Sequence, residues 1–208
     1  MPLLIQWDAT WSALGVARTA ALRDIYDDLI ARYSEPHRKY HTLRHLDECL
    51  ATFADHRALA EHPAEVEVAL WFHDAIYDTR SNRNEAESAA LAVAVVRGAG
   101  MSTECAQRVE DLVMATRHDA IPSGADARIL VDVDLSILAA DPERFDEYER
   151  QVRAEYAWVP GYLFRKERRK ILHGFLARPA IFSTLELRAR HEAQARANLK
   201  RSLEALDG

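Results

Sequence analysis

The chain has 208 residues, a length that fits one globular domain able to bury its own core. Hydrophobic residues make up 49% and charged residues 29% of it, ordinary proportions for a globular protein. The formal net charge of −6 argues against a dedicated duplex-DNA binder. No segment approaches the ~18 apolar residues of a membrane span, so no membrane partner is expected.

The two cysteines, Cys49 and Cys105, lie far apart in helical patterns and offer no disulfide framework. We expect both to be small buried hydrophobic residues. Scarce cysteine suits a reducing cytoplasm. The N-terminal MPLLIQWDATW has no basic n-region, so a secretory signal is not expected. These features together predict a cytoplasmic protein.

Charge is unevenly distributed along the chain. Residues 150–208 carry 13 Lys and Arg against 6 Asp and Glu, a net of +7, which leaves residues 1–149 at −13. The basic C-terminal third could hold an anionic substrate or neutralise the acidic remainder. Solvated helix faces explain the same pattern, and the sequence leaves the alternatives open.

Apolar residues recur at helical spacing throughout, and only 7 glycines and 7 prolines interrupt them. Asp8 or Thr10 is expected to cap a first helix, and Pro63 to open the third. Gly98 and Gly100 are expected to end the fourth. The predicted helices run to about residue 33, then cover about 43–56, 64–76, 84–97, 103–117, 127–139, 142–156, 161–176 and 188–206. The sequence therefore predicts an all-α fold.

The most informative dipeptide is His73-Asp74, at the end of the apolar segment 64–76. A neutral imidazole beside a carboxylate offers a mixed nitrogen and oxygen donor set that suits several divalent metals. Adjacent residues on a helix do not share a face. Both can therefore reach one ion only where the helix meets its neighbours.

Further metal-ligand candidates lie on both sides of this pair. His41 and His45 are four residues apart, so they are expected to share one face at a helix start. Asp132 and Asp134 are flanked by Ile, Leu and Val, where an unpartnered charge would be costly. Asp134 has the better case as a ligand, and Asp132 is expected to cap a helix or support a ligand.

The sequence resembles the HD-domain superfamily, through its pattern of His45, His73-Asp74 and Asp134. It is most similar to a subgroup of predicted metal-dependent HD phosphohydrolases of bacteria. The resemblance spans about residues 33–199. The segments that carry it are RKYHTLRH, ALWFHDAIYD, NEAESA, ATRH, VDVDLSIL, VRAEY and EAQARANL.

The resemblance implies a single HD-type helical bundle over residues 1–208, with a metal-binding core at about 33–140 and C-terminal helices 141–206 packed on it. It also implies hydrolysis of a phosphate ester at one divalent ion (Mn, Co, Ni, Zn, Fe or Mg). The implied metal ligands are His45, His73, Asp74 and Asp134. The expected substrate is a small phosphorylated molecule of nucleotide type, and nucleoside monophosphates, alarmones, cyclic nucleotides and sugar phosphates all fit.

HD proteins with two metals place two further histidines between the His-Asp pair and the last aspartate. This chain has only His118 there, which favours one metal over a di-iron oxygenase. The alarmone-hydrolase branch keeps a Glu-Asp pair soon after its His-Asp. Here only Asp78 matches, so that activity is left open.

Catalytic roles are assigned to Asp74, which is also an implied metal ligand, and to residues near the predicted metal site. Asp74 is the central candidate, and the general acid or base is sought among Asp78, His118 and Glu85. First-turn placement on a helix explains Glu85 equally well, and plain helix surface is an equally good interpretation of Ser88. Arg38, Lys39, Arg44 and Arg153 are the candidates for phosphate binding, since guanidinium groups pair bidentately with phosphate.

Two of these functional hypotheses have rivals. Arg153 could brace neighbouring helices instead of binding phosphate, and Arg168, Glu192, Arg196 and Asn198 are interpreted as structural. The whole site could serve a sensor that binds metal and nucleotide without turnover. A structural bundle with fortuitous ligands is the remaining alternative, and the sequence leaves a homo-oligomer open.

Overall fold

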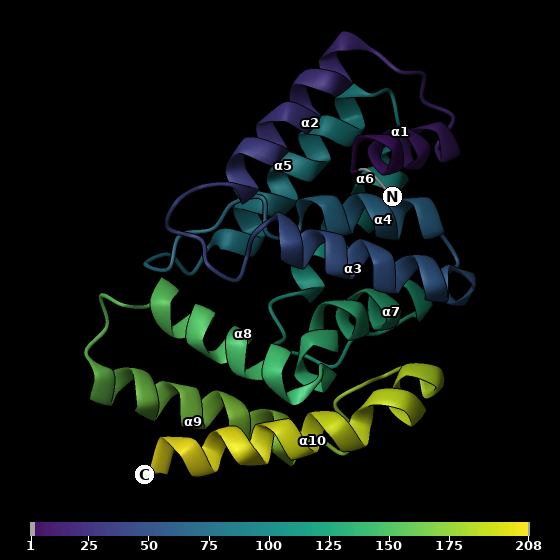
Figure 1. Ribbon diagram of the computed structural model, residues 1–208. Coiled ribbons are helices and arrows are strands. Elements are labelled where there is room, and N and C mark those ends of the chain that lie inside the picture. The colour runs from purple at the N-terminus through teal and green to yellow at the C-terminus, as the bar shows by residue number, and fades with distance from the viewer. Residues whose placement is uncertain (1–2, 208) are drawn as a thin grey trace. The chain divides into compact units, whose positions relative to one another are not determined.

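The computed structural model describes residues 3–207, and within them the only regular structure is helical. The prediction of an all-α fold is confirmed. The α-helices (Figure 1) are α1 (Leu3–Ala13), α2 (Ala20–Tyr33), α3 (Leu43–His56), α4 (Pro63–Phe72), α5 (Asn84–Gly98), α6 (Thr103–Ala115), α7 (Ala125–Asp134), α8 (Pro142–Glu155), α9 (Gly161–Ala177) and α10 (Leu185–Asp207). Two short 3-10 helices, η1 (Arg57–Leu59) and η2 (Leu135–Ala139), follow α3 and α7.

The chain divides into two compact units, residues 1–131 and residues 132–208. The boundary falls inside α7. The organisation of the chain as one domain, with a core at about 33–140 and packed helices at 141–206, stays a prediction.

Helix α4 forms the centre of the first unit. Every residue from Ala64 to Phe72 is buried, so this helix is enclosed on all sides. It packs against α1, α3, α5 and α6, and Figure 1 shows α3 running beside it. Two carboxylates on it, Glu65 and Glu67, pair with Arg108 and Arg57, which compensates for their burial.

The predicted first helix, from Asp8 or Thr10 to Tyr33, is wrong, because the chain forms two helices there. Gly15 has a φ of 75°, and its N–H donates to Ser12 O while Val16 N–H donates to Trp11 O. This left-handed glycine ends α1 in a Schellman arrangement. The N-cap of the next helix, α2, is Thr19, whose hydroxyl accepts from Leu22 N–H.

Most other predicted boundaries agree with the structure to within a few residues. Helix α3 matches its predicted range, and Pro63 opens α4 as expected. Gly98 ends α5 and Ser102 caps α6. The predicted helix 127–139 is divided at Asp134, where the α-helix gives way to η2.

The second unit is built around η2 and α10. Helix α10 packs against η2, α8 and α9, and Figure 1 shows α9 and α10 side by side. The amide of Asn198 on α10 donates to Leu138 O and Ala140 O, which fixes η2 on that helix. Arg168 bonds Tyr148 and Glu149 within the same unit.

The structural interpretation of these polar residues is confirmed. The Glu192 carboxylate accepts from Ile181 N–H and Phe182 N–H and pairs with Arg196. Arg196 also donates to Leu176 O and Arg178 O, so it holds the end of α9. Arg153 donates to Tyr156 O and Val159 O, which closes the end of α8.

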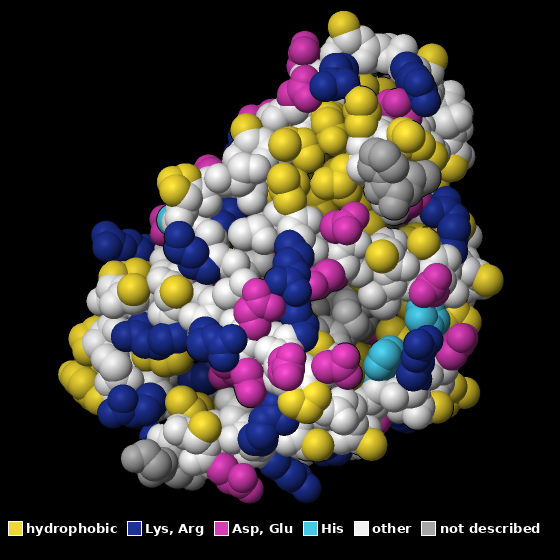
Figure 2. Space-filling view, viewed as in Figure 1, with side chains coloured by type: hydrophobic (Ala, Val, Ile, Leu, Met, Phe, Trp, Pro, Cys, Tyr) yellow, Lys and Arg dark blue, Asp and Glu magenta, His cyan; other side chains and the backbone are white. Residues whose placement is uncertain are grey.

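Lys and Arg side chains gather over α8 and α9 on the face shown in Figure 2. On α9, Arg165, Lys166 and Lys170 are exposed, while Arg168 is buried. The excess of cations in the C-terminal third is therefore divided between solvated positions and internal braces.

Within residues 3–207, no helix is both long and apolar enough to cross a membrane.

Asp132 holds the chain that leads into α10. Its fully buried side chain accepts from Ser183 N–H, Thr184 N–H and the Thr184 hydroxyl, each at 2.7 Å. The expectation that Asp132 caps a helix is not confirmed, because its backbone donors, Ser183 and Thr184, lie just before the first residue of α10 and some fifty residues further along the chain.

Replacing Asp132 by Ala leaves these donors without their acceptor, so we expect a loss of about 2–3 kcal/mol in the free energy of unfolding. Asp132→Asn keeps one acceptor oxygen and should lose less. Equilibrium unfolding in urea measures both. Asp146→Ala is the control from the same unit, because its exposed pair with Arg201 is worth less than about 1 kcal/mol. Equal losses for the two alanine variants would contradict this role.

Candidate metal centre

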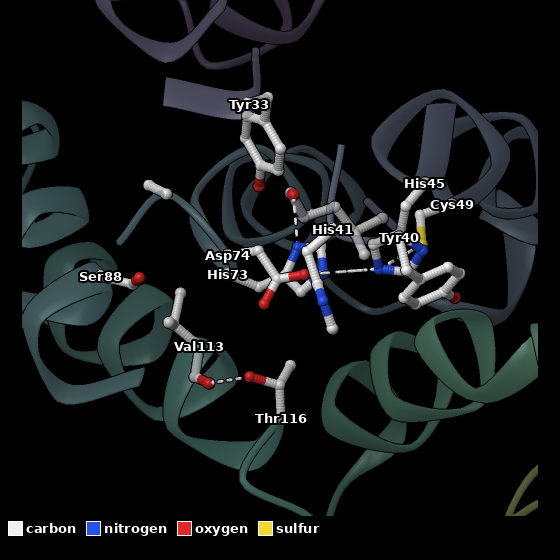
Figure 3. Close-up of polar contacts among 12 residues, drawn as sticks. Tyr33, Tyr40, His41, His45, Cys49, His73, Asp74, Ser88, Val113 and Thr116 are labelled. Carbon is white, nitrogen blue, oxygen red and sulfur yellow. Dashed lines mark hydrogen bonds and ion pairs between the residues drawn. The ribbon is translucent and has the colours of Figure 1, made fainter. Parts of the chain in front are cut away.

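Two segments of the first unit bring metal-ligating side chains together. His45 and Cys49 lie one turn apart on α3, with exposed fractions of 2% and 1%. His73, also 2% exposed, follows the end of α4. Figure 3 shows their side chains converging with that of Asp74.

The donor atoms lie at contact distances. The Nε2 atoms of His45 and His73 are 3.2 Å apart, and Asp74 Oδ2 lies 3.0 Å from the latter and 3.5 Å from the former. Cys49 Sγ lies 3.6 and 3.7 Å from the two ring nitrogens of His45. The ligand atoms of His45, Cys49 and His73 all lie within 4.8 Å of one another. This buried cluster could hold a metal ion.

The His73-Asp74 pair is not inside a helix, as the segment 64–76 had predicted. Helix α4 ends at Phe72, and the pair lies in the turn that follows. Leaving the helix removes the difficulty that adjacent helical residues face different ways, because the turn directs both side chains to one point.

A backbone bond orients the ring of His73. Its Nδ1 lies 2.8 Å from Leu70 O, in the preceding turn of α4. A carbonyl accepts, so Nδ1 carries the hydrogen and, in the neutral ring, Nε2 keeps its lone pair. The lone pair then faces the cluster, which is the arrangement a metal-binding histidine needs.

Asp74 is held as a carboxylate. Burial opposes its ionisation, but charge on His73 and His41 and hydrogen bonds from His45 and His73 outweigh burial and hold its pKa well below the usual range. The group therefore stays ionised at neutral pH and can act as an oxygen ligand.

The turn that carries the pair is fixed by Arg38, and the prediction that Arg38 binds phosphate is wrong. Its side chain is buried and donates to Asp74 O at 2.6 Å, to Ala75 O at 3.0 Å and to His41 O at 3.3 Å. Its Nε also pairs with Glu35. A guanidinium committed to these oxygens braces the site and is not available to substrate.

Other side chains hold the backbone just beyond the pair. Ser88 is fully buried, which rules out the interpretation as helix surface, and its hydroxyl accepts from Ile76 N–H at 2.9 Å. The Asn84 side chain exchanges two hydrogen bonds with the backbone of Asp78, each at 3.0 Å. The N-cap position of α5 is Arg83, whose side chain makes no capping hydrogen bond.

The remaining predicted site residues occupy different settings. Asp78 is exposed and accepts from Arg80 N–H, while Glu85 is half-buried in the first turn of α5. His118 is half-buried after α6 with a φ of 56°, a left-handed conformation that is uncommon outside glycine. Asp134 is the half-buried last residue of α7 and belongs to the second unit. Their catalytic and metal-binding roles stay predictions.

The cations expected to bind phosphate differ in setting. Lys39 is exposed, and its amine donates to Pro36 O. Arg44 is half exposed and pairs with Glu48 one turn along α3. Arg153 belongs to the second unit, where it braces the end of α8 as its alternative interpretation held.

Sequence reasoning missed Cys49, which was expected to be a plain core residue. The available signal was its spacing, since a cysteine four residues after a candidate ligand histidine shares that histidine's helix face. His41 lies just before α3, with its ring 5.9 Å from that of His45 and 4.2 Å from that of Tyr77.

The donor chemistry fits a divalent metal. Two imidazoles and a carboxylate suit Zn, Mn, Fe, Co and Ni. Ligands at bond lengths of about 2.0–2.1 Å in tetrahedral geometry lie roughly 3.4 Å apart. The separations of 3.0, 3.2 and 3.5 Å among His45, His73 and Asp74 are close to that value.

Comparison with known proteins adds no relative: no family model, no curated protein and no solved structure matches the chain.

The bracing role of Arg38 can be tested by substitution. Arg38→Ala leaves buried carbonyl oxygens of the turn without a donor, so we expect a loss of about 2–4 kcal/mol in the free energy of unfolding. Arg38→Lys should recover only part, because an ammonium does not reproduce the planar fork. Equilibrium urea unfolding gives the values.

The matched control is Arg44→Ala, which removes an exposed arginine paired with Glu48 and should cost less than about 0.5 kcal/mol. A stability of Arg38→Ala within that range would show that the turn does not depend on the guanidinium.

Proposed function

We propose that the protein is a divalent-metal-dependent phosphohydrolase of the HD type. The observation that carries this proposal is the convergence of the buried His45 and His73 with Asp74, with donor atoms 3.0–3.5 Å apart. The sequence resemblance names the same three residues. The resemblance also implies Asp134 as a ligand.

Each proposed ligand contributes a different property to the metal site. His73 offers a lone pair set by the bond from its Nδ1–H to Leu70 O. His45 projects from the first turn of α3, and the ionised Asp74 supplies negative charge that offsets the cation. When bound, a divalent ion lowers the pKa of a water molecule and polarises the phosphoryl group.

We assign proton transfer to His41 and phosphate binding to the residues around it. His41 is half-buried, its charge acts on Asp74, and an imidazole can serve as a general acid or base. Lys39 and Arg44 flank it in the sequence and are exposed. Their present partners, a carbonyl and an exposed carboxylate, are exchanged at little cost for a phosphate group.

The proposed substrate is a small phosphate ester, with nucleotides as the first class to examine. Two exposed cations and one imidazole suit a single phosphate group rather than a long polyanion. Asp78, Glu85 and His118 are the further candidates for general acid or base.

Asp74→Ala tests the proposal, because it removes the charged ligand and should reduce bound metal from about one ion per chain to a trace while abolishing hydrolysis. The measurements are elemental analysis of the purified protein and turnover of p-nitrophenyl phosphate, bis-p-nitrophenyl phosphate and a nucleotide panel with added Mn²⁺. Far-ultraviolet circular dichroism checks that the variant remains folded.

Asp55→Ala is the control, since it removes an exposed carboxylate from α3 and should keep both metal and turnover. Full metal content in Asp74→Ala would overturn the ligand assignment. Metal binding by the unaltered protein without turnover of any of these substrates would instead favour a sensor.

A further inference from the structure

We propose that Cys49 is a sulfur ligand of the same centre and makes it selective for thiophilic ions such as Zn²⁺ and Co²⁺ over Mg²⁺. This inference rests on the proposed metal centre and adds a ligand that the His45, His73-Asp74 and Asp134 pattern does not contain.

The position of Cys49 supports this role. It follows His45 by one turn on α3, so both side chains leave the same face of the helix. The thiol is 1% exposed, and Figure 3 shows it beside the His45 ring. Its sulfur lies within 4.8 Å of a donor nitrogen of His73 as well.

The distances suit a shared ion. With bond lengths of about 2.3 Å to sulfur and about 2.0–2.1 Å to nitrogen, tetrahedral geometry places the two donor atoms roughly 3.6 Å apart. Cys49 Sγ lies 3.7 Å from His45 Nε2, and the two imidazole Nε2 atoms lie 3.2 Å apart. Two of the three donor pairs therefore lie near ligand spacing, and the third pair, Cys49 and His73, lies within 4.8 Å.

The other cysteine shows what a purely structural thiol looks like in this chain. Cys105 is 3% exposed, and burial together with the Glu65 carboxylate raises the pKa of its thiol to about 11. A neighbouring negative charge opposes a thiolate there. Cys49 instead lies near the imidazoles of His45 and His73, the two proposed nitrogen ligands.

The chemical consequence concerns which ion is bound. A thiolate is a soft ligand that favours Zn²⁺, Co²⁺ or Fe²⁺, whereas Mg²⁺ requires oxygen ligands and keeps its waters. Binding transfers the thiol proton to solvent and forms the sulfur–metal bond, with no change in oxidation state.

Cobalt titration of the metal-stripped full-length protein tests the inference. Bound Co²⁺ gives weak visible bands from its own electrons, and a thiolate ligand adds intense near-ultraviolet charge-transfer absorption. We expect both in the unaltered protein, and retention of Co²⁺ in the presence of excess Mg²⁺. Cys49→Ser should lose the charge-transfer band and weaken cobalt affinity by roughly 10–100-fold or more.

Cys105→Ala is the matched control, since it leaves Cys49 as the only thiol and should keep the band. This comparison holds even if Cys49→Ser fails to fold. Visible bands without charge transfer in the unaltered protein would overturn the sulfur ligand and leave the proposed metal centre in place. Absence of any cobalt binding would overturn the metal centre itself.

Discussion

The hydrogen bonds from Arg38 to the carbonyl oxygens of Asp74 and Ala75 set the geometry of the site. Helix α4 ends one residue before His73, so the chain that carries the pair has lost the hydrogen-bond pattern of the helix. Buried carbonyl groups in such a turn need donors. One guanidinium supplies them, while its own charge is paired with Glu35. The position of the Asp74 carboxylate thus depends on an arginine from the loop before α3.

The apolar surroundings of α4 strengthen the polar interactions within the cluster and raise the cost of leaving a charge there uncompensated. Trp71 and Phe72 are fully buried beside His73, so polar groups here interact at short range with little water between them. Two imidazoles facing a carboxylate are stable in such a place when hydrogen bonds or a cation compensate the charge. The low pKa of Asp74 shows the compensation that the histidines provide without an ion. Binding of a divalent cation would displace the protons that the histidines share with Asp74 and leave neutral imidazoles as ligands.

Sequence reasoning succeeded where local rules decide the structure. Amphipathic spacing defined α3, and Pro63 marked the start of α4. It failed at Gly15, because one glycine in a helical pattern is compatible with continuation until its φ is known. It failed at Arg38 for a different reason. An arginine before a histidine cluster looks like a phosphate ligand, and its actual partners are backbone oxygens more than thirty residues away, which no residue type reveals.

Cys49 shows why a motif does not define a site completely. The pattern of histidines and aspartates specifies hard and borderline donors, which many divalent ions accept. A sulfur placed 3.6 and 3.7 Å from the two ring nitrogens of His45 changes the donor set without changing that pattern. A softer set binds its ion more firmly and reduces the positive charge that acts on a bound water or phosphoryl group. If the sulfur binds, ion selectivity in this chain comes from a helix position one turn beyond the motif, and proteins that share the motif can differ in metal for that reason alone.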